Sequence, residues 1–185
     1  MITLPLFLQS VRMQERIWNR DFVLLISSNF LMYITYYAIL SALPIYLVKD
    51  LHASKTQVGI VIGAYTIASV LVRPFSGYAL DRFGRRTIFL LALIIYTLLF
   101  AGYLVAITIS AIILLRFAQG ITWAFTTVSG STIGVDLIPV SKRGEGIGYY
   151  ALSTTLGMSA GPVIGLFVCH QWGYTTMFVS GCFIS

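Results

Sequence analysis

Long apolar runs separated by short polar clusters are the dominant pattern of the sequence. Five runs are long enough to cross a bilayer, whose hydrocarbon core of about 30 Å needs about 20 apolar residues in helical form. They extend from Phe22 to about Val48, from about Gln57 to Leu80, from about Thr87 to Thr108, from about Ala111 to Val135 and from about Gly146 to Cys169. A sixth run begins near Gly173 and reaches Ser185, which is too short to cross. The pattern therefore predicts an all-α integral membrane bundle with five complete transmembrane helices and a truncated sixth.

Composition strengthens this prediction and excludes several classes of protein. The 185 residues are 58% hydrophobic and 10% charged, whereas a soluble domain carries about 25% charged residues. This surface holds too little charge for a soluble enzyme or a soluble nucleic-acid-binding domain. The net charge of +6 comes from short clusters between the apolar runs rather than from one face of a polar domain. We therefore expect membrane lipids, and no nucleic acid, among the partners.

The distribution of Lys and Arg between the loops predicts the orientation of the helices. One side of the bilayer would carry eight basic residues: Arg12, Arg16, Arg20, Arg82, Arg85, Arg86, Lys142 and Arg143. The other side would carry only Lys49 and Lys55. Because short cytoplasmic loops are enriched in Lys and Arg, we expect residues 1–21 to form a cytoplasmic N-terminal segment. Residues 22–185 would form a multi-pass unit in the cell (cytoplasmic) membrane. Residues 12–20, with Trp18, fit either a short interfacial helix or a disordered tail.

The sequence contains little that points to catalysis or to metal binding. Cys169 and Cys182 form no disulfide or metal framework. His52 and His170 lie at expected helix ends, where a solvated histidine is the ordinary case. The sequence has no H-E-x-x-H motif and no phosphate-binding glycine loop. We expect no enzymatic activity, no cofactor and no metal. A membrane-embedded hydrolase is disfavoured because the spans hold no nucleophile–base pair.

The loop after the second run carries the most informative motif, GYALDRFGRR over residues 77–86. Gly77 would let a neighbouring helix approach, and Asp81 lies one helical turn later on the same face. Gly84 permits a tight reversal of the chain. Three basic residues would hold the loop at the anionic membrane surface: Arg82, Arg85 and Arg86. A plain positively charged hairpin explains these arginines but not Asp81, a residue that membrane helices usually avoid.

This motif resembles the G-x-x-x-D-R-x-G-R-R signature that the major facilitator superfamily carries between its second and third helices, which is its position here. Residues 116–120, RFAQG, resemble the R-F-x-x-G element of that superfamily's fourth helix. Residues 157–165, GMSAGPVIG, resemble the G-x-x-x-G-P-x-x-G element of its exporters, especially drug/proton antiporters, with Leu166 in place of the usual next glycine. Residues 136–144 and 42–46 also resemble superfamily segments. The resemblance therefore covers about residues 18–185.

The resemblance implies roles for four groups of residues. A cytoplasmic gating motif would contain Gly77, Asp81, Arg82, Gly84, Arg85, Arg86 and Asp136. Proton coupling at the cavity would involve Arg116, Gln119 and Gly120. The helix-five motif would seal the external side through Gly157, Gly161, Pro162 and Gly165. The possible substrate cavity would be lined by Asn29, Tyr33, Tyr37, Arg73 and Trp123.

Each of these roles has a simpler alternative. The gating charges would then be solvated loop residues, and the three glycines, spaced by four, would form a static packing face. Arg73 and Arg116 would extend their side chains to the membrane surfaces. No acidic residue lies in the apolar part of any span, so neither arginine has an intramembrane carboxylate partner in this chain. This differs from drug/proton antiporters, which often place a proton-carrying acid inside a helix of the first half.

The chain is thus expected to be the first six-helix half of a secondary active transporter, its C-terminal half being absent and supplied by a longer protein or by a second chain. The expected function is proton-coupled efflux of small organic solutes by alternating access, with the solute and protons as partners. One alternative is proton-coupled uptake of a sugar or metabolite. An alternative of another class is a non-transporting half-transporter that acts as an assembly or regulatory membrane subunit.

Overall fold

The computed structural model describes residues 17–184, which form long helices and no strand. The elements in chain order are α2 (Arg20–Lys49), α3 (Lys55–Phe83), α4 (Arg85–Gly102), α5 (Ile109–Leu137), the short 3-10 turn η1 (Val140–Lys142) and α6 (Arg143–Ile184). The prediction of an all-α bundle is confirmed. Residues 12–16 of the possible interfacial helix lie outside the described residues.

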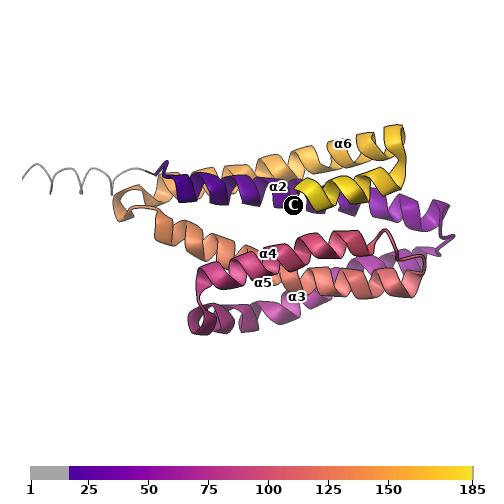
Figure 1. Cartoon of the computed structure of the whole chain (residues 1–185), viewed down its shortest axis with the longest axis horizontal. Helices are drawn as coiled ribbons and strands as arrows, with labels where there is room; N and C mark the ends of the chain where they lie inside the picture. Colours follow the sequence, from indigo (N-terminus) through magenta and orange to yellow (C-terminus); the bar gives the residue numbers. More distant parts are fainter. Residues whose placement is uncertain (1–16, 185) are drawn as a thin grey trace, which may run out of the picture.

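α6 is two helices that meet at Gly173, whose φ of 82° and ψ of 173° interrupt the helical backbone. The second piece folds back along the bundle (the yellow end of the chain in Figure 1). This position matches the predicted start of the sixth run. Only glycine adopts such a backbone conformation readily, so the sequence marks the reversal with the residue that allows it.

Polar side chains at three helix starts explain where those helices begin. The Oδ1 atom of Asn19 accepts a hydrogen bond of 2.8 Å from the backbone N–H of Phe22 at the start of α2. Ser54 and Gln57 form a reciprocal capping box at the start of α3. Thr108 accepts a bond from the N–H of Ala111 at the start of α5. Each cap satisfies a backbone donor that the helix itself leaves without a partner.

The third helix differs most from its prediction. α4 ends at Gly102, whereas the apolar run predicted a helix continuing to Thr108. The intervening residues form a connection whose Tyr103 and Ala106 side chains are buried against the bundle. Hydropathy did not separate a buried connection from a helical turn here, because both are apolar.

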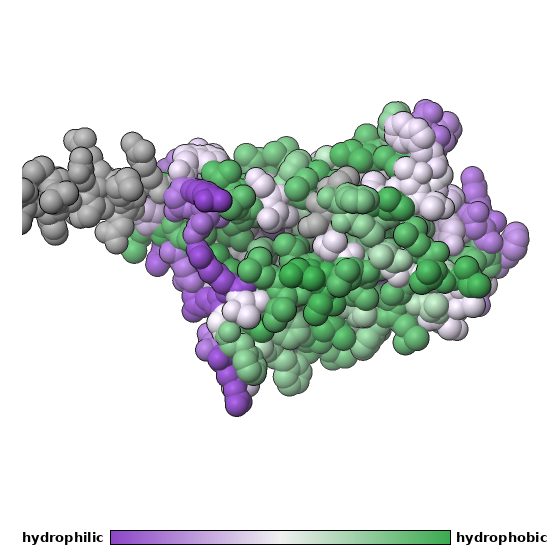
Figure 2. All heavy atoms as spheres, viewed as in Figure 1, coloured by the Kyte–Doolittle hydropathy of each residue, from purple (hydrophilic) through white to green (hydrophobic). Residues whose placement is uncertain are grey.

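The helices pack as two groups. α2 contacts mainly α6, α3 contacts mainly α5, and α4 contacts both α5 and α6 (Figure 1). A broad apolar band covers the side of the bundle that is seen in Figure 2, and polar residues gather at its two ends. Within the described residues, five helices are long and apolar enough to cross a membrane. The protein is therefore a multi-pass membrane protein.

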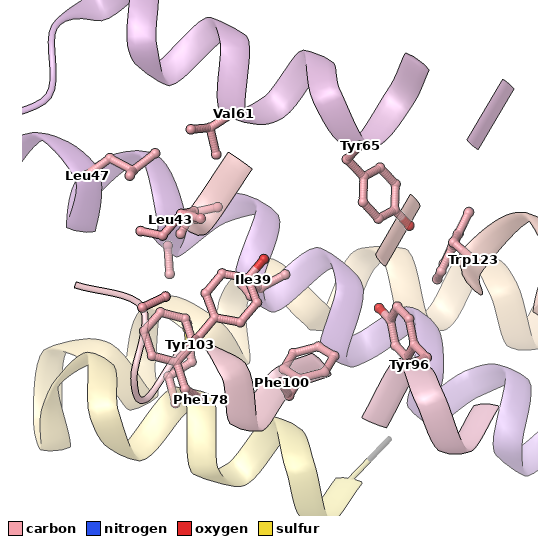
Figure 3. Packing of buried hydrophobic residues seen from close by; sticks show 14 of the residues in the cluster. Ile39, Leu43, Leu47, Val61, Tyr65, Tyr96, Phe100, Tyr103, Trp123 and Phe178 are labelled. Carbon is pink, nitrogen blue, oxygen red and sulfur yellow. The ribbon is translucent and has the colours of Figure 1, made fainter. Parts of the chain in front are cut away.

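A core rich in aromatic residues holds the two groups together. Tyr65 of α3, Tyr96 of α4 and Trp123 of α5 point toward one another in Figure 3. Tyr103 stacks on Phe178 of the returning part of α6, with ring centroids 5.0 Å apart. These contacts fix the position of α5, which carries the most unusual residue of the core.

Candidate functional site

Arg116 of α5 is buried in this core, with only 2% of its surface exposed. It lies about 10 Å along the helix from Ile109, at 1.5 Å per residue. The burial excludes the simpler alternative in which the guanidinium reaches the membrane surface. A charged side chain at such a site carries a large desolvation penalty unless other groups stabilise it.

Aromatic rings are the neighbours that stabilise Arg116. The centre of its guanidinium lies 5.6 Å from the ring centroid of Tyr65 and 6.0 Å from that of Tyr103. Both distances fit cation–π contacts. The Nε and Nη2 atoms of Arg116 have no hydrogen-bond partner, and neither has the hydroxyl of Tyr65. The site therefore holds a buried guanidinium, two of whose donor nitrogens have no hydrogen-bond partner.

No carboxylate neutralises Arg116 within the described residues. The acidic residues of this part of the chain all lie at helix ends: Asp21, Asp50, Asp81, Asp136 and Glu145. The described bundle therefore contains a buried cation without a buried anion.

Gln119 and Gly120 follow Arg116 on the same helix. Gln119 makes a hydrogen bond, and Gly120 makes a close contact between helices. The Oε1 atom of Gln119 accepts a 2.8 Å hydrogen bond from the Tyr103 hydroxyl, while its Nε2 atom has no partner. A Cβ atom at Gly120 would collide with the carbonyl oxygen of Tyr65 and lie 2.9 Å from the Cβ of Ala68. Gly120 thus allows α5 to approach α3 closely, which brings Tyr65 over Arg116.

The rings of α2 extend this aromatic cluster toward the outside of the bundle. Tyr36 lies 4.5 Å from Trp123 and 4.9 Å from Tyr65, measured between ring centroids. Tyr33 lies 4.9 Å from Trp123 and stacks on Tyr37 at 6.3 Å. The three α2 tyrosines are only partly buried. The structure therefore brings the predicted Tyr33, Tyr37 and Trp123 together as one aromatic surface.

The other two predicted cavity residues are placed differently. Arg73 of α3 is exposed and does not join the buried residues around Arg116. Asn29 is buried, and its Nδ2 atom donates 2.9 Å hydrogen bonds to Ser153 Oγ and Thr154 Oγ1 of α6. Asn29 thus joins α2 to α6, and its amide nitrogen is engaged in that contact.

The predicted gating charges meet at one end of the bundle. Arg85 at the start of α4 forms an ion pair with Asp136 near the end of α5, and its Nη2 atom is 4.0 Å from Oδ1 of Asp81. Gly84 alone separates α3 from α4, and its φ is +88°, a value that favours glycine. The tight reversal therefore places Arg85 between the two carboxylates.

The remaining residues of this loop have separate surroundings. Arg86 pairs with Asp21 at the start of α2. Arg82 donates a 3.1 Å hydrogen bond to the Tyr78 hydroxyl. An added Cβ at Gly77 would meet no described atom within 4 Å, so no described helix approaches that position.

The glycines of the predicted helix-five motif lie directly against α2. A Cβ at Gly157 would be 2.7 Å from the Cβ of Tyr33, and one at Gly161 would be 2.6 Å from the Cβ of Tyr37. At Gly165 it would be 2.6 Å from the Cα of Ala38. Such short separations need residues without side chains. Within the described bundle, these glycines are the packing face between α6 and α2; Pro162 lies inside α6 beside them.

Comparison with known proteins identifies the family of this bundle. The sequence profile described as Major Facilitator Superfamily matches residues 25–185. The chain belongs to the Major Facilitator Superfamily. Multidrug resistance protein 2 of Bacillus subtilis (strain 168) is 26% identical over 147 residues, which are 80% of this chain and 36% of that protein.

Two further relatives carry similar names. Multidrug resistance protein 1 of Bacillus subtilis (strain 168) is 23% identical over 165 residues, 89% of this chain and 42% of that protein. Quinolone resistance protein NorA of Staphylococcus aureus is 24% identical over 152 residues, 82% of this chain and 39% of that protein. The chain thus spans about two fifths of the length of these relatives. The resemblance to the superfamily, drawn from the motifs, is confirmed.

Several contacts of this major facilitator bundle were not predicted from its sequence. Tyr65, Tyr96 and Tyr103 surround Arg116 and Trp123 but lie on other elements. The spacing of seven between Tyr96 and Tyr103 is a signal that could have placed them on one face. Asp21 was not predicted to pair with Arg86, because the contact joins residues 65 positions apart. No group of three metal-binding side chains occurs among residues 17–184.

Proposed function

We propose that this chain is the first half of a proton-coupled efflux carrier for small organic solutes that works by alternating access. The superfamily match and the resistance proteins among its relatives support this proposal. A complementary half would come from the rest of a longer protein or from a second chain, because transporters of this type move two helical repeats around a midplane site.

The buried Arg116 is the observation that carries the proton-coupling part of the proposal. A positive charge within about 4–6 Å favours the ionised form of an acid. If the helices around Arg116 part during the transport cycle, an acidic group that approaches it would therefore release its proton, and a group that moves away would bind one. The absence of a carboxylate among the described core residues means that this acid would belong to the complementary half or to the solute.

The aromatic surface of α2 and α5 supports the proposed class of solute. Tyr33, Tyr36 and Tyr37 are partly buried and lie beside Trp123. Rings arranged in this way stack on planar organic molecules and attract organic cations. We therefore propose that this surface contacts an aromatic solute. Arg116 would supply a positive charge in the core beneath the surface.

The charged end of the bundle would serve as the cytoplasmic gate. Arg85 lies between Asp81 and Asp136, so all three are available as a latch for the complementary half. The count of eight basic residues against two supports a cytoplasmic position for this end. In this proposed orientation the N terminus would also lie in the cytoplasm.

Transport into membrane vesicles tests the proposal. The protein, expressed from its natural reading frame, should accumulate ethidium in inverted vesicles when a proton gradient is imposed, and a protonophore should abolish this uptake. Arg116→Ala should lower the rate at least about tenfold, because the fixed charge is lost. Arg143→Ala removes an exposed charge outside the core and should leave the rate unchanged.

The other possible outcomes support different functions. Proton-driven accumulation only in right-side-out vesicles would indicate an uptake carrier. Full biological activity of Arg116→Ala would favour a regulatory or assembly subunit, in which the glycine contacts matter and the buried charge does not.

A further inference from the structure

Tyr103, in the connection between α4 and α5, reaches the buried surroundings of Arg116. Its side chain is 3% exposed, its ring stacks on Phe178, and its ring centroid lies 6.0 Å from the centre of the Arg116 guanidinium (Figure 3). A Cβ atom at Gly102, the residue before it, would lie 2.6 Å from Cδ2 of Leu115 in α5. The connection therefore packs directly on α5, and the Tyr103 ring lies in the core.

The hydroxyl of Tyr103 engages the oxygen of the Gln119 side chain. It donates a 2.8 Å hydrogen bond to Oε1 of Gln119, a residue that is 1% exposed. In a glutamine side chain Oε1 accepts hydrogen bonds, whereas Nε2 can only donate them. The Nε2 atom of Gln119 has no partner. The amide thus uses its acceptor on Tyr103 and keeps only donors without a partner.

This arrangement matters for Arg116 because a guanidinium also has only donors. Gln119 lies three residues after Arg116 on α5, a spacing at which side chains on a helix are neighbours. Its Oε1 atom is a suitable acceptor, and hydrogen bonds from a charged donor are among the stronger ones in proteins. In the structure Oε1 accepts from Tyr103 instead, and Nε and Nη2 of Arg116 have no hydrogen-bond partner.

The titratable side chains in this part of the core do not neutralise Arg116. They are tyrosines from three helices and from the connection: Tyr36 of α2, Tyr65 of α3, Tyr96 of α4 and Tyr103. A tyrosine is ordinarily neutral at about pH 7. Gln119 therefore carries the amide oxygen, three residues away on the same helix, that can become a partner of the charge.

We propose that Tyr103 is a positioning residue that holds the Gln119 oxygen away from Arg116, so that the positive charge stays available to the acid of the transport cycle. This inference rests on the proposed proton coupling. The contact itself can be tested without transport.

The Nε–H proton of Arg116 reports the contact in nuclear magnetic resonance spectra. The protein, expressed from its natural reading frame, would be labelled with nitrogen-15 arginine and purified in detergent, and Arg116→Lys would identify the signal by its loss. Tyr103→Phe keeps the ring beside Arg116 but frees Oε1 of Gln119. The Arg116 signal should then move downfield, because its proton acquires a hydrogen bond to an amide oxygen. Tyr103→Phe combined with Gln119→Leu lacks that oxygen and should show no such shift.

Tyr46→Phe is the matched control. It removes a hydroxyl from another ring that packs on Phe178, with centroids 5.6 Å apart, and should leave the Arg116 signal in place. Three results would overturn the proposal: no shift in Tyr103→Phe, an equal shift in Tyr46→Phe, or a shift that persists when Gln119→Leu is added. In each case the Gln119 oxygen would not be what Tyr103 controls.

The pH dependence of transport tests the consequence of the contact. A hydrogen bond from Arg116 to Gln119 weakens the positive field on the acid, which then binds its proton at higher pH. In the vesicle assay the pH midpoint of Tyr103→Phe should rise by roughly 0.5–1 unit, and adding Gln119→Leu should reverse this rise, whatever the rates. An unshifted midpoint in a protein that transports would overturn the proposal. A wild type that fails to transport would refute the proposed function instead, and the arginine signal would still decide the contact.

Discussion

Replacing Gly165 by alanine tests the contact between α6 and α2. The new Cβ would lie 2.6 Å from Cα, 2.7 Å from the carbonyl oxygen and 2.8 Å from Cβ of Ala38. Carbon atoms pack best at about 3.5–4.0 Å, so the helices would have to separate by about 1 Å. The contacts are mostly with backbone, which cannot turn aside as the end of a long side chain can.

Gly148→Ala is the matched control for this change. Gly148 lies in the same helix, and its added Cβ would meet nothing within 4 Å. Both substitutions gain the same helix propensity, about 0.5–1 kcal/mol, so this gain cancels when the two variants are compared. The remaining difference is the cost of overpacking, about 1–3 kcal/mol. Gly165→Ala should therefore be less stable than Gly148→Ala by that amount.

Unfolding in mixed micelles measures this difference. The purified variants would be titrated with sodium dodecyl sulfate, and helix content and tryptophan fluorescence would follow the transition; Trp123 is the buried tryptophan among Trp18, Trp123 and Trp172. Gly165→Ala should unfold at a lower detergent fraction than the wild type, and Gly148→Ala at the same or a higher fraction. Equal midpoints for the two variants would refute the close approach of α6 to α2.

Three further predictions follow from other contacts. Asn29→Leu removes two hydrogen bonds to α6 and should lower the free energy of unfolding by about 1 kcal/mol in the same titration; an unchanged midpoint would show that these bonds are not formed. Reporter tags inserted after Lys55 and after Arg86 should lie on opposite sides of the membrane, and labelling from the same side would contradict the arrangement of spans. Asp81→Asn should lower transport several-fold without changing the amount of protein in the membrane; a wild-type rate would count against the latch.

The helices were predictable because hydropathy is a local property of the sequence. The end of one helix, α4, was not predictable in this way. The starts of the second and fourth runs lie close to Ser54 and Thr108, whose side chains cap α3 and α5. The predicted end of the third helix was wrong by several residues. Its last predicted part is the apolar connection after Gly102, held by the bond from Tyr103 to Gln119, and that bond depends on two elements meeting in space.

The candidate site was predictable only as separate parts. Arg116, Gln119 and Trp123 lie three and four residues apart in one apolar run, a spacing that puts them on one face of a helix, and the sequence indicates that no carboxylate lies in the spans. It did not predict which groups stabilise the charge, because Tyr65 and Tyr103 come from other elements. The cluster of Asp81, Arg85 and Asp136 was predictable. Asp81 and Arg85 are four residues apart, and Asp136 begins a segment that resembles a loop of the superfamily.

The single-residue connection at Gly84 has a mechanical consequence. Since no flexible loop separates α3 from α4, a tilt of α3 at this end must carry the start of α4 with it. The ion pair of Arg85 with Asp136 passes that displacement to α5, the helix that bears Arg116. Loosening the connection, for example by inserting three glycines after Gly84, would uncouple these movements while leaving each helix intact.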